Sequence, residues 1–475
     1  MDLRYSAGAR RTPPAGAQLN ISGEVLMKHR FPSRRRSAVL GVSVAASVAA
    51  LCLAAGAQAH GHPGDLHHGK HGRQHGLRAL YVSPSGTAGQ ADKSCRTAAY
   101  STVQSAVNDA ASGATIVVCG GSYSEDVVIS TPLKLLGQNG ATIQGTKTTT
   151  FMCDQLGPTG PGTAPCLAAI TIKSSHVTVS GFTVEGAVGE GILATGSLQG
   201  GSIHDVTIEH NRVVGNDTGG IPPSMTSPYP QCVEVGQVPG DCGEGIHLMG
   251  VDHSKVSRNF VAHNSGGVLL TDEFGPTHDN LVEKNVITKN LFDCGVTVPG
   301  HNPNALDSNG KRQPKVAGVY DNVIRGNVIT GNGTQGEGAG VLFANASAGT
   351  ASYDNLVQGN VIAGNELSGV TLHAHTIAPG TFEDLSGNRV IGNTIGKNNV
   401  GSAQVPGDPL DGTVTDPDTT GVLVFSASVP VTVTIAHNKI ANNHFGIWLG
   451  VGGHVTATVK NNRFRHVDVP VNTVS

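Results

Sequence analysis

The sequence predicts an all-β solenoid in which every coil contributes three short strands, with about ten coils in all. One observation is a repeated segment: DNVIRGNVITGN at residues 321–332 is followed by DNLVQGNVIAGN at residues 354–365. A second is that the core of this segment, Asn-x-apolar-x-x-Asn, recurs along the chain. The copies are Asn211/Asn216, Asn259/Asn264, Asn285/Asn290, Asn327/Asn332, Asn360/Asn365, Asn393/Asn398 and Asn438/Asn443, and a last copy keeps only Asn462.

The pattern and length of one copy give its three strands. Apolar residues alternate with other residues in three runs, D-N-L-V, x-V-I and a later G-V-x-L, and period two is typical of strands that bury one side. The closest copies, Asn259 to Asn285 and Asn438 to Asn462, are 26 and 24 residues apart. This spacing is too short for two strand–helix units, so we expect three strands and three turns per coil.

The repeated asparagines have a physical purpose at the bend between the first two strands. Asn tolerates the left-handed backbone conformation at small cost. Its amide both donates and accepts hydrogen bonds, so Asn above Asn is expected to form a ladder along the stack. We therefore expect these residues to be structural.

The segment that opens the repeats is YVSPSG…TVQSAV…GATIVVCGGSYSEDVVI, from Tyr81 to Ile129. With the asparagine pattern and the three-strand coil, it is similar to the right-handed parallel β-helix proteins of the pectate-lyase-like superfamily. The nearest pattern is the right-handed β-helix repeat group that includes NosD-like proteins. The resemblance covers residues 80–475 and implies a right-handed parallel β-helix with coils about 4.8 Å apart. In that superfamily the substrate cleft lies on the sheet made by the Gly-apolar-x-apolar strands.

Residues 100–112 (YSTVQSAVNDAAS) predict a short amphipathic helix before the first coil. Val103, Ala106, Val107 and Ala110 fall on one face, and Ser/Thr residues precede them. Terminal coils of a solenoid need a cap. We expect the helix to cover the N-terminal end of the stack.

Composition narrows the class of function. The chain has 475 residues with 65 Gly, 4% aromatic and 14% charged residues, which suits a turn-rich solenoid. The formal net charge is −3 and there is no basic stripe of the kind that a phosphate backbone requires. We expect no nucleic-acid partner, and the oligomeric state stays open.

The N-terminal part predicts export. Basic residues after Met27 precede the apolar run 38–55, and Ala57-Gln58-Ala59 supplies a small-x-small cleavage site. We expect residues 1–59 to be an extension with a signal peptide, residues 60–78 a His-rich linker and residues 79–475 the β-helix domain. The mature protein is then secreted without a stable membrane anchor; a retained anchor is the alternative. The true start is Met1 or Met27.

The His-rich linker holds six imidazoles among Gly, Asp and Lys between His60 and His75. Such a tract either binds a divalent metal loosely or serves as a flexible linker.

Seven of the eight cysteines lie beyond the signal segment. In an exported chain, close pairs predict the disulfides Cys95–Cys119, Cys153–Cys166 and Cys232–Cys242. Cys294 is then left over, as a buried small apolar residue or as a reactive thiol.

Insertions fall at the two corners that flank the Gly-apolar-x-apolar strand and never at the asparagine bend. We expect these loops to wall a groove along that sheet, because variable loops on a rigid scaffold carry function. The predicted outward positions on the groove floor are His247, Leu269, Thr297, Leu342, Thr371, Leu423 and Trp448.

The best candidate site in this groove combines carboxylates and imidazoles. Asp272 and Glu273 follow one strand and His301 follows the next, so one coil separates them. These three residues are predicted to be catalytic, as a general acid and base, or to ligate Ca²⁺ or Zn²⁺. The predicted substrate-binding residues are His247, Asp293, His373, His375 and Trp448. Asp and Glu are also ordinary turn residues after a strand, and Trp448 is alternatively a cap over the C-terminal coils.

The resulting hypothesis is a secreted protein that binds or acts on a polysaccharide in the groove, as a lyase, hydrolase or epimerase, with Ca²⁺ as a possible cofactor. The alternative is a non-catalytic binding or surface protein, or a NosD-like accessory protein. The sequence contains neither an adjacent Asp-Asp pair, as in the polygalacturonases, nor a Lys or Arg on the predicted floor, the base of many β-helix lyases. The resemblance therefore transfers no mechanism.

Overall fold

The computed structural model describes residues 79–146, 152–157, 160–165, 167–217, 243–334, 338–345, 347–374, 380–401, 418–426, 428–450 and 454–474. For 152–157 and 160–165 it describes only the backbone. The predicted signal peptide, the His60–His75 tract, His375 and the side chains of the predicted Cys153–Cys166 and Cys232–Cys242 disulfides lie outside this description.

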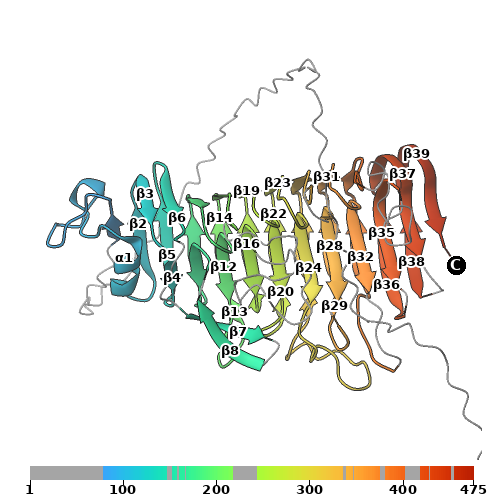
Figure 1. Cartoon of the computed structure of the whole chain (residues 1–475), viewed down its shortest axis with the longest axis horizontal. Helices are drawn as coiled ribbons and strands as arrows, with labels where there is room; N and C mark the ends of the chain where they lie inside the picture. Colours follow the sequence, from blue (N-terminus) through green and yellow to red (C-terminus); the bar gives the residue numbers. More distant parts are fainter. Residues whose placement is uncertain are drawn as a thin grey trace, which may run out of the picture. The chain divides into compact units, whose positions relative to one another are not determined.

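The described strands stack as parallel coils (Figure 1). One sheet runs along the stack and carries the first strand of each coil. Its strands pair in the order β1 (Leu80–Val82), β2 (Ala114–Val118), β5 (Leu133–Gly137), β10 (Thr178–Ser180), β14 (Thr207–Glu209), β18 (Lys255–Ser257), β22 (Leu281–Glu283), β26 (Val323–Arg325), β30 (Leu356–Gln358), β33 (Asn388–Ile391), β36 (Val431–Ala436) and β38 (Val455–Lys460).

The second and third strands of the coils form two further parallel runs. The run after the asparagine bend is β3 (Gly121–Ser124), β6 (Ala141–Gln144), β11 (Thr183–Glu185), β15 (Arg212–Val214), β19 (Phe260–Ala262), β23 (Val286–Thr288), β27 (Val328–Thr330), β31 (Val361–Ala363) and β34 (Thr394–Ile395). The Gly-apolar-x-apolar run is β4 (Val127–Ile129), β9 (Ile170–Ile172), β12 (Ile192–Thr195), β16 (Ile246–Met249), β20 (Val268–Thr271), β24 (Val296–Gly300), β28 (Val341–Asn345), β32 (Val370–Ala374) and β35 (Thr420–Ser426). The long strands β37 (Lys439–Gly450) and β39 (Arg463–Thr473) join the two runs into one sheet. The prediction of a parallel β-helix with three strands per coil is confirmed.

Short strands precede the first sheet in the middle coils. β13 (Ile203–His204) pairs with β17 (Val251–Asp252), and β21 (Thr277–His278), β25 (Val319–Tyr320) and β29 (Ser352–Tyr353) pair in sequence. An antiparallel hairpin, β7 (Met152–Gly157) with β8 (Gly160–Pro165), projects from the early coils (Figure 1).

The predicted asparagine ladder is confirmed. The described residues contain three ladders, in which the Nδ2 of each Asn donates to the Oδ1 of the Asn on the next coil; at the step from Asn398 to Asn443 the backbone N–H is the donor. The first runs from Asn211 to Asn462 and the second from Asn216 to Asn443. The third, through Asn280, Asn322, Asn355 and Asn388, was not predicted.

The predicted left-handed conformation of the ladder asparagines is wrong. The left-handed residue is the one before the ladder Asn, as in Lys284 (φ 56°), Gly326 (φ 61°) and His437 (φ 58°), except at Asn398, where it is the residue after, Asn399 (φ 56°). The reason is geometric, because the backbone N–H of each ladder Asn also donates to the Oδ1 of the next Asn, as Asn327 does to Asn360 at 2.8 Å. The chain must complete its bend before that residue, so the asparagines themselves keep ordinary backbone angles.

The interior of the stack is one apolar core, filled mainly by Val, Ile, Leu and Ala from the inward positions of all three runs. Because alternate residues of each strand point inward, nearly every coil adds its own layer to this core. Within the described residues no helix is both long and apolar enough to span a bilayer.

The predicted cap is confirmed as helix α1 (Val103–Asp109), which contacts β1, β2 and β4. Val103, Ala106 and Val107 are buried in the main core. The Thr102 side chain accepts the backbone N–H of Ser105, and the Glu125 carboxylate accepts the N–H groups at the start of the helix. A short 3₁₀ turn, η1 (Cys95–Thr97), precedes it.

Cys95 and Cys119 form the predicted disulfide beside this cap, closing a segment with a sequence separation of 24 residues. Cys294 is buried, and its sulfur accepts the backbone N–H of Ala339 at 3.1 Å. The prediction that Cys294 is buried is therefore confirmed, although its sulfur takes part in polar contacts.

We expect the Cys95→Ser/Cys119→Ser double variant to lose about 3 kcal/mol of stability, as the loop-closure entropy of such a loop indicates. Thermal unfolding followed by circular dichroism measures the loss, and hydrogen exchange at α1 locates it. Reducing agent added to the wild type is the matched comparison. A variant whose α1 amides exchange as slowly as in the wild type would show that packing alone holds the cap.

Candidate functional site

The outward face of the Gly-apolar-x-apolar strands, predicted as an open groove floor, is largely buried. His247, Leu269, Thr297, Leu423 and Trp448 are each at most 3% exposed. Two apolar clusters outside the main core account for much of this: Ala168, Leu193, Met249 and Phe274 in the early coils, and Leu423, Phe425 and Trp448 in the late ones. The prediction of an open floor along the sheet is wrong because these side chains are buried, beside apolar clusters in the early and late coils and among polar side chains such as Glu190 and Asp293 between them.

Trp448 and His373 belong to the late part of this covered face. Trp448 packs with Leu423, Phe425 and Phe445, which agrees with the alternative that it covers the C-terminal coils. The His373 ring lies edge-on against Phe425, with centroids 5.1 Å apart. Strand register places His373 two coils beyond Pro299, so it lies away from the residues that follow β20 and β24.

His247 lies among buried polar groups in the early coils. Its Nδ1 is 3.2 Å from Glu190 Oε1, and its Nε2 is 2.8 Å from Thr271 Oγ1. Glu190, Glu244 and His247 offer ligand atoms that all lie within 4.8 Å of one another, and all three residues are buried. Both ring nitrogens therefore have protein partners already.

Asp293 lies two coils beyond His247, where Thr297 Oγ1 donates to its Oδ2 at 2.9 Å. Burial raises the pKa of Asp293, and the hydrogen bonds from Cys294 and Thr297 act in the opposite direction. The carboxylate is 6% exposed in a buried setting that leaves little room for a ligand.

The predicted catalytic residues do come together at the corner after β20 and β24. His301 Nδ1 lies 2.6 Å from Glu273 Oε1, and these two side chains are each 4% exposed. Sequence spacing alone predicted this contact, because the two residues follow the same strand position on successive coils.

Asp272 differs from its two neighbours in what its carboxylate contacts. Its Oδ1 accepts the backbone N–H groups of His301 at 2.7 Å and Asn302 at 3.0 Å, and its Oδ2 accepts that of Gly318 at 2.7 Å. Burial and the nearby Glu273 charge raise the pKa of Asp272 to about 7, although the N–H groups of His301 and Asn302 act to lower it. The geometry is that of a residue that fixes the backbone around His301.

An open cleft lies beside the Glu273–His301 pair. It has a volume of about 380 Å³ and combines hydroxyl, amide and charged groups with apolar side chains. The polar lining includes Ser197, Ser202, Asp252, Glu273, Asn302 and Lys315. On its apolar side, Leu198 and Val316 are 36% and 50% exposed.

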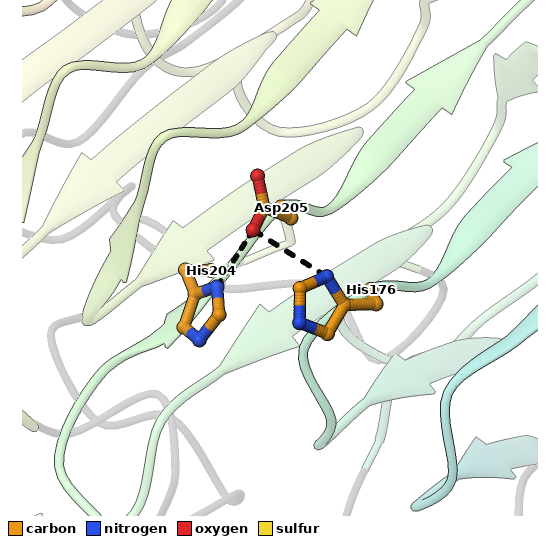
Figure 2. Close-up of side chains that lie close together, drawn as sticks. All are labelled: His176, His204 and Asp205. Atoms are coloured by element: carbon orange, nitrogen blue, oxygen red, sulfur yellow. Dashed lines mark hydrogen bonds and ion pairs between the residues drawn. The ribbon is translucent and has the colours of Figure 1, made fainter. Parts of the chain in front are cut away.

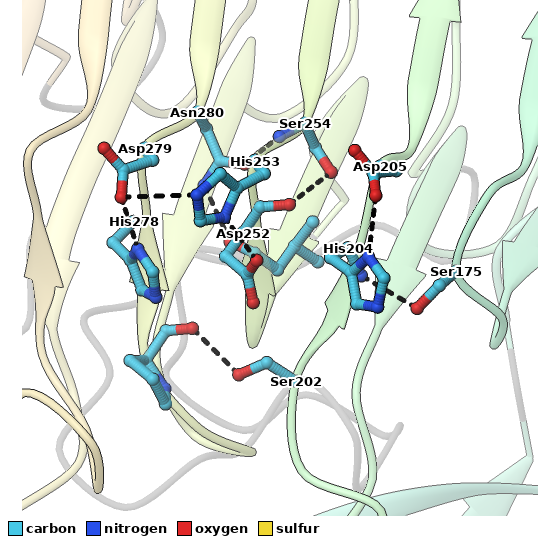
Figure 3. A network of polar contacts seen from close by, with 12 residues as sticks. Ser175, Ser202, His204, Asp205, Asp252, His253, Ser254, His278, Asp279 and Asn280 are labelled. Carbon is cyan, nitrogen blue, oxygen red and sulfur yellow. Dashed lines mark hydrogen bonds and ion pairs between the residues drawn. The ribbon is translucent and has the colours of Figure 1, made fainter.

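Sequence reasoning missed a second group of polar residues, at the turn that leads into the first sheet. His and Asp recur there over four successive coils, at His176, His204-Asp205, Asp252-His253 and His278-Asp279. Figure 3 shows the last three of these positions. The signal that was available is the recurrence of a His–Asp or Asp–His dipeptide just before three successive first strands.

Residues 169–362 match the family model "Periplasmic copper-binding protein (NosD)", and residues 302–464 match "Right handed beta helix region". No curated protein sequence matches the chain. Similar solved structures include the A-module of mannuronan C-5 epimerase AlgE4 from Azotobacter vinelandii, which is 17% identical over 78% of this chain and 94% of that chain, with a TM-score of 0.47. An alginate lyase from Paenibacillus sp. is 11% identical over 84% and 100%, with a TM-score of 0.39. The GH136 lacto-N-biosidase from Eubacterium ramulus is 12% identical over 82% and 68%, with a TM-score of 0.42.

At these identities and scores the solved structures carry no argument about activity. The two family models cover the middle and late coils, where the strand pairing and the asparagine ladders are most regular. On these matches and this coil geometry, the chain is a right-handed parallel β-helix protein that carries regions matching the NosD and right-handed β-helix region models.

Proposed function

We propose that the protein binds an acidic polysaccharide in the cleft beside Glu273 and His301, outside the cytoplasm. The observation that carries the proposal is the contact of 2.6 Å between Glu273 Oε1 and His301 Nδ1 next to an open, polar cleft. Hydroxyl and amide groups on the lining suit a hydroxylated ligand, and the exposed Leu198 and Val316 side chains suit its C–H faces. Lys315 supplies a cation for a uronate carboxylate.

The disulfide between Cys95 and Cys119 supports the extracytoplasmic part of the proposal. Structural disulfides persist in oxidising compartments and are rare in the cytosol.

The geometry favours proton abstraction over glycoside hydrolysis. Hydrolysis uses two carboxylates on opposite sides of the scissile bond, whereas Asp272 already accepts three backbone hydrogen bonds. A carboxylate–imidazole pair can instead remove the proton at C5 of a uronate. Expulsion of the C4 oxygen, which takes a proton from water in the open cleft, then gives an unsaturated product, and delivery of a proton from water to the opposite face of C5 gives the epimer. We therefore propose a lyase or epimerase reaction, with His301 as base and Glu273 holding its imidazole.

We expect Glu273→Gln and His301→Gln to lower the rate of product formation from polygalacturonate or alginate by about 10²-fold or more. Absorbance of unsaturated products and proton exchange at C5 measure the two reactions. Retention on the immobilised polysaccharide should change little in these variants and fall in Lys315→Ala. Glu209→Gln, on the first sheet, is the matched control.

The two parts of the proposal fail separately. Unchanged rates in Glu273→Gln would remove the pair from the chemistry, whereas equal retention of Lys315→Ala and wild type would remove the cleft from binding. Retention that depends on Lys315, without any product, would leave a binding protein.

A non-catalytic accessory protein is the second candidate function. The match of residues 169–362 to the NosD family model favours it. In that case the polysaccharides give no product and no Lys315-dependent retention.

A further inference from the structure

The turn that leads into the first sheet has the same form in successive coils. Its second residue adopts the left-handed conformation, with φ between 48° and 59° at His176, Asp205, His253, Asp279, Asp321 and Asp354. The residue before it is Ser175, His204, Asp252, His278, Tyr320 or Tyr353 in the same order. Stacking of coils therefore places these side chains in two adjacent columns on the surface, which we name the His/Asp strip from His176 to Asp279.

The first cluster in the strip is formed by two successive coils. His176 Nδ1 lies 3.4 Å and His204 Nδ1 lies 2.8 Å from the same oxygen, Asp205 Oδ2 (Figure 2). The two imidazole rings are edge-on, with centroids 4.8 Å apart. Between 46% and 59% of each of the three side chains is exposed, so an ion and its water ligands can reach all of them.

The second cluster repeats this arrangement two coils further along (Figure 3). His278 Nδ1 lies 2.8 Å and His253 Nε2 lies 3.8 Å from Asp279 Oδ2. The other ring nitrogen of His253, Nδ1, lies 2.7 Å from Asp252 Oδ1. A carboxylate on the far nitrogen of a metal-ligating histidine fixes its tautomer and orientation, and Asp252 has that position.

The turn itself does not require these imidazoles. In the next two coils the same turn is made by Tyr320-Asp321 and Tyr353-Asp354, whose tyrosine rings stack at 4.9 Å. Asp tolerates the left-handed conformation, so the backbone geometry is kept without histidine. The two His-His-Asp clusters are therefore additional to what the fold needs.

The distances within each cluster suit a small metal ion. Bonds of about 2.0–2.1 Å in a tetrahedral site place ligand atoms roughly 3.4 Å apart, and the ligand atoms of each cluster lie within 4.8 Å of one another. Two imidazoles and one carboxylate favour Zn²⁺ or Cu²⁺, whereas Ca²⁺ prefers oxygen ligands.

We propose that the His/Asp strip binds two divalent transition-metal ions, one at His176, His204 and Asp205 and one at His253, His278 and Asp279. Each ion has three protein ligands, and water completes its coordination. The second site is the tighter one, because Asp252 orients the imidazole of His253. This proposal rests on the side-chain geometry of the strip and is independent of the polysaccharide proposal.

The test is isothermal titration of the full-length chain with Zn²⁺, and nitrogen hyperfine coupling in the electron paramagnetic resonance spectrum with Cu²⁺. We expect His253→Gln/His278→Gln to remove one equivalent of bound Zn²⁺ and His176→Gln/His204→Gln to remove another. Full-length variants are compared with each other, so any ions held at His60–His75 are common to all of them and cancel. Circular dichroism and the melting temperature establish that each variant is folded.

The matched control is His437→Gln/His466→Gln. These two exposed histidines also have left-handed backbones, with φ of 58° and 51°, but lie outside the strip, His437 just before Asn438 and His466 within β39. We expect this variant to bind as many ions as the wild type. Asp279→Asn, which keeps a residue that tolerates the turn, should weaken the second site at least 10-fold. Wild-type stoichiometry in both strip variants, or binding of Ca²⁺ as tight as that of Zn²⁺, would overturn the proposal.

Discussion

Replacing Asn327 by alanine is expected to lower the free energy of unfolding by roughly 4 kcal/mol. Asn327 is 1% exposed and lies in the middle of the first ladder. Its Nδ2 donates to Val282 O at 2.9 Å and to Asn360 Oδ1 at 3.0 Å. Its Oδ1 accepts both the backbone N–H and the Nδ2 of Asn285. Alanine removes all four contacts and leaves buried polar partners without them, which costs more than the loss of a single exposed hydrogen bond.

The effect should be local as well as large. Each coil of a solenoid contacts only its neighbours, so hydrogen exchange should increase most in the coils that contain Asn285 and Asn360. Urea unfolding gives the total loss, and the exchange pattern shows where the stack opens. One ordinary hydrogen bond contributes about 1 kcal/mol net. A loss of stability below this value, with hydrogen exchange unchanged in both coils, would mean that the ladder contributes little. The apolar core would then be what stabilises the stack.

Two controls in the same chain separate the ladder from general effects. Val328→Ala changes the adjacent residue, whose side chain is 38% exposed, and is expected to cost less than about 0.5 kcal/mol. Asn462→Ala changes a ladder residue that is only partly buried, with contacts to Ile435 and Asn438. Its cost should lie between those of the other two variants.

The fold could be predicted well from the sequence because each repeated residue type has a direct physical role in the coil. Alternating apolar residues define the strands, and a ladder requires the same amide at the same place in every coil. The left-handed position was misassigned because Gly, Lys, Arg and His all occupy it, as in Gly326 and Lys284. No single residue type therefore marks it in the sequence.

The candidate site was predictable only in part. Register alone placed Glu273 beside His301, since both follow the same strand position. It could not reveal that three backbone N–H groups point at the Asp272 carboxylate, because Gly318 approaches it from a loop of unpredictable path. Nor could it reveal that apolar side chains such as Phe274 and Trp448 bury the outward face of the sheet. The His/Asp strip was overlooked because Asp is itself a common turn residue.

Asp272→Asn is expected to destabilise the protein by about 2 kcal/mol at pH 5, in addition to any loss of activity. The amide oxygen of the variant can still accept the N–H groups of His301 and Asn302. Its amide nitrogen, however, would face the N–H of Gly318, which leaves a buried donor unsatisfied. A fall in activity in this variant would therefore report the displaced backbone of His301, so stability has to be measured beside it.

The dependence of this cost on pH tests the protonation state of Asp272. Its pKa is raised to about 7 in the folded protein, first by burial and then by the Glu273 charge, against about 3.9 in the unfolded chain. Between these values the folded state holds a proton that the unfolded state has released. Raising the pH through this window therefore lowers wild-type stability, by up to about 1.4 kcal/mol per pH unit from this group.

The amide of the Asp272→Asn variant does not titrate, so the stability gap between wild type and variant should narrow as the pH rises from 5 to 8. Urea unfolding at both pH values, with Asp307→Asn at a partly exposed turn as the control, measures the change in the gap. A gap that stays constant from pH 5 to 8 would mean that the three backbone donors outweigh burial and keep the folded-state pKa of Asp272 below this range, so that the carboxylate is ionised at both pH values. In that case Asp272 would hold a permanent negative charge beside Glu273 and His301, and the imidazole would be stabilised in its protonated form. His301 would then be better suited to donate a proton than to remove one.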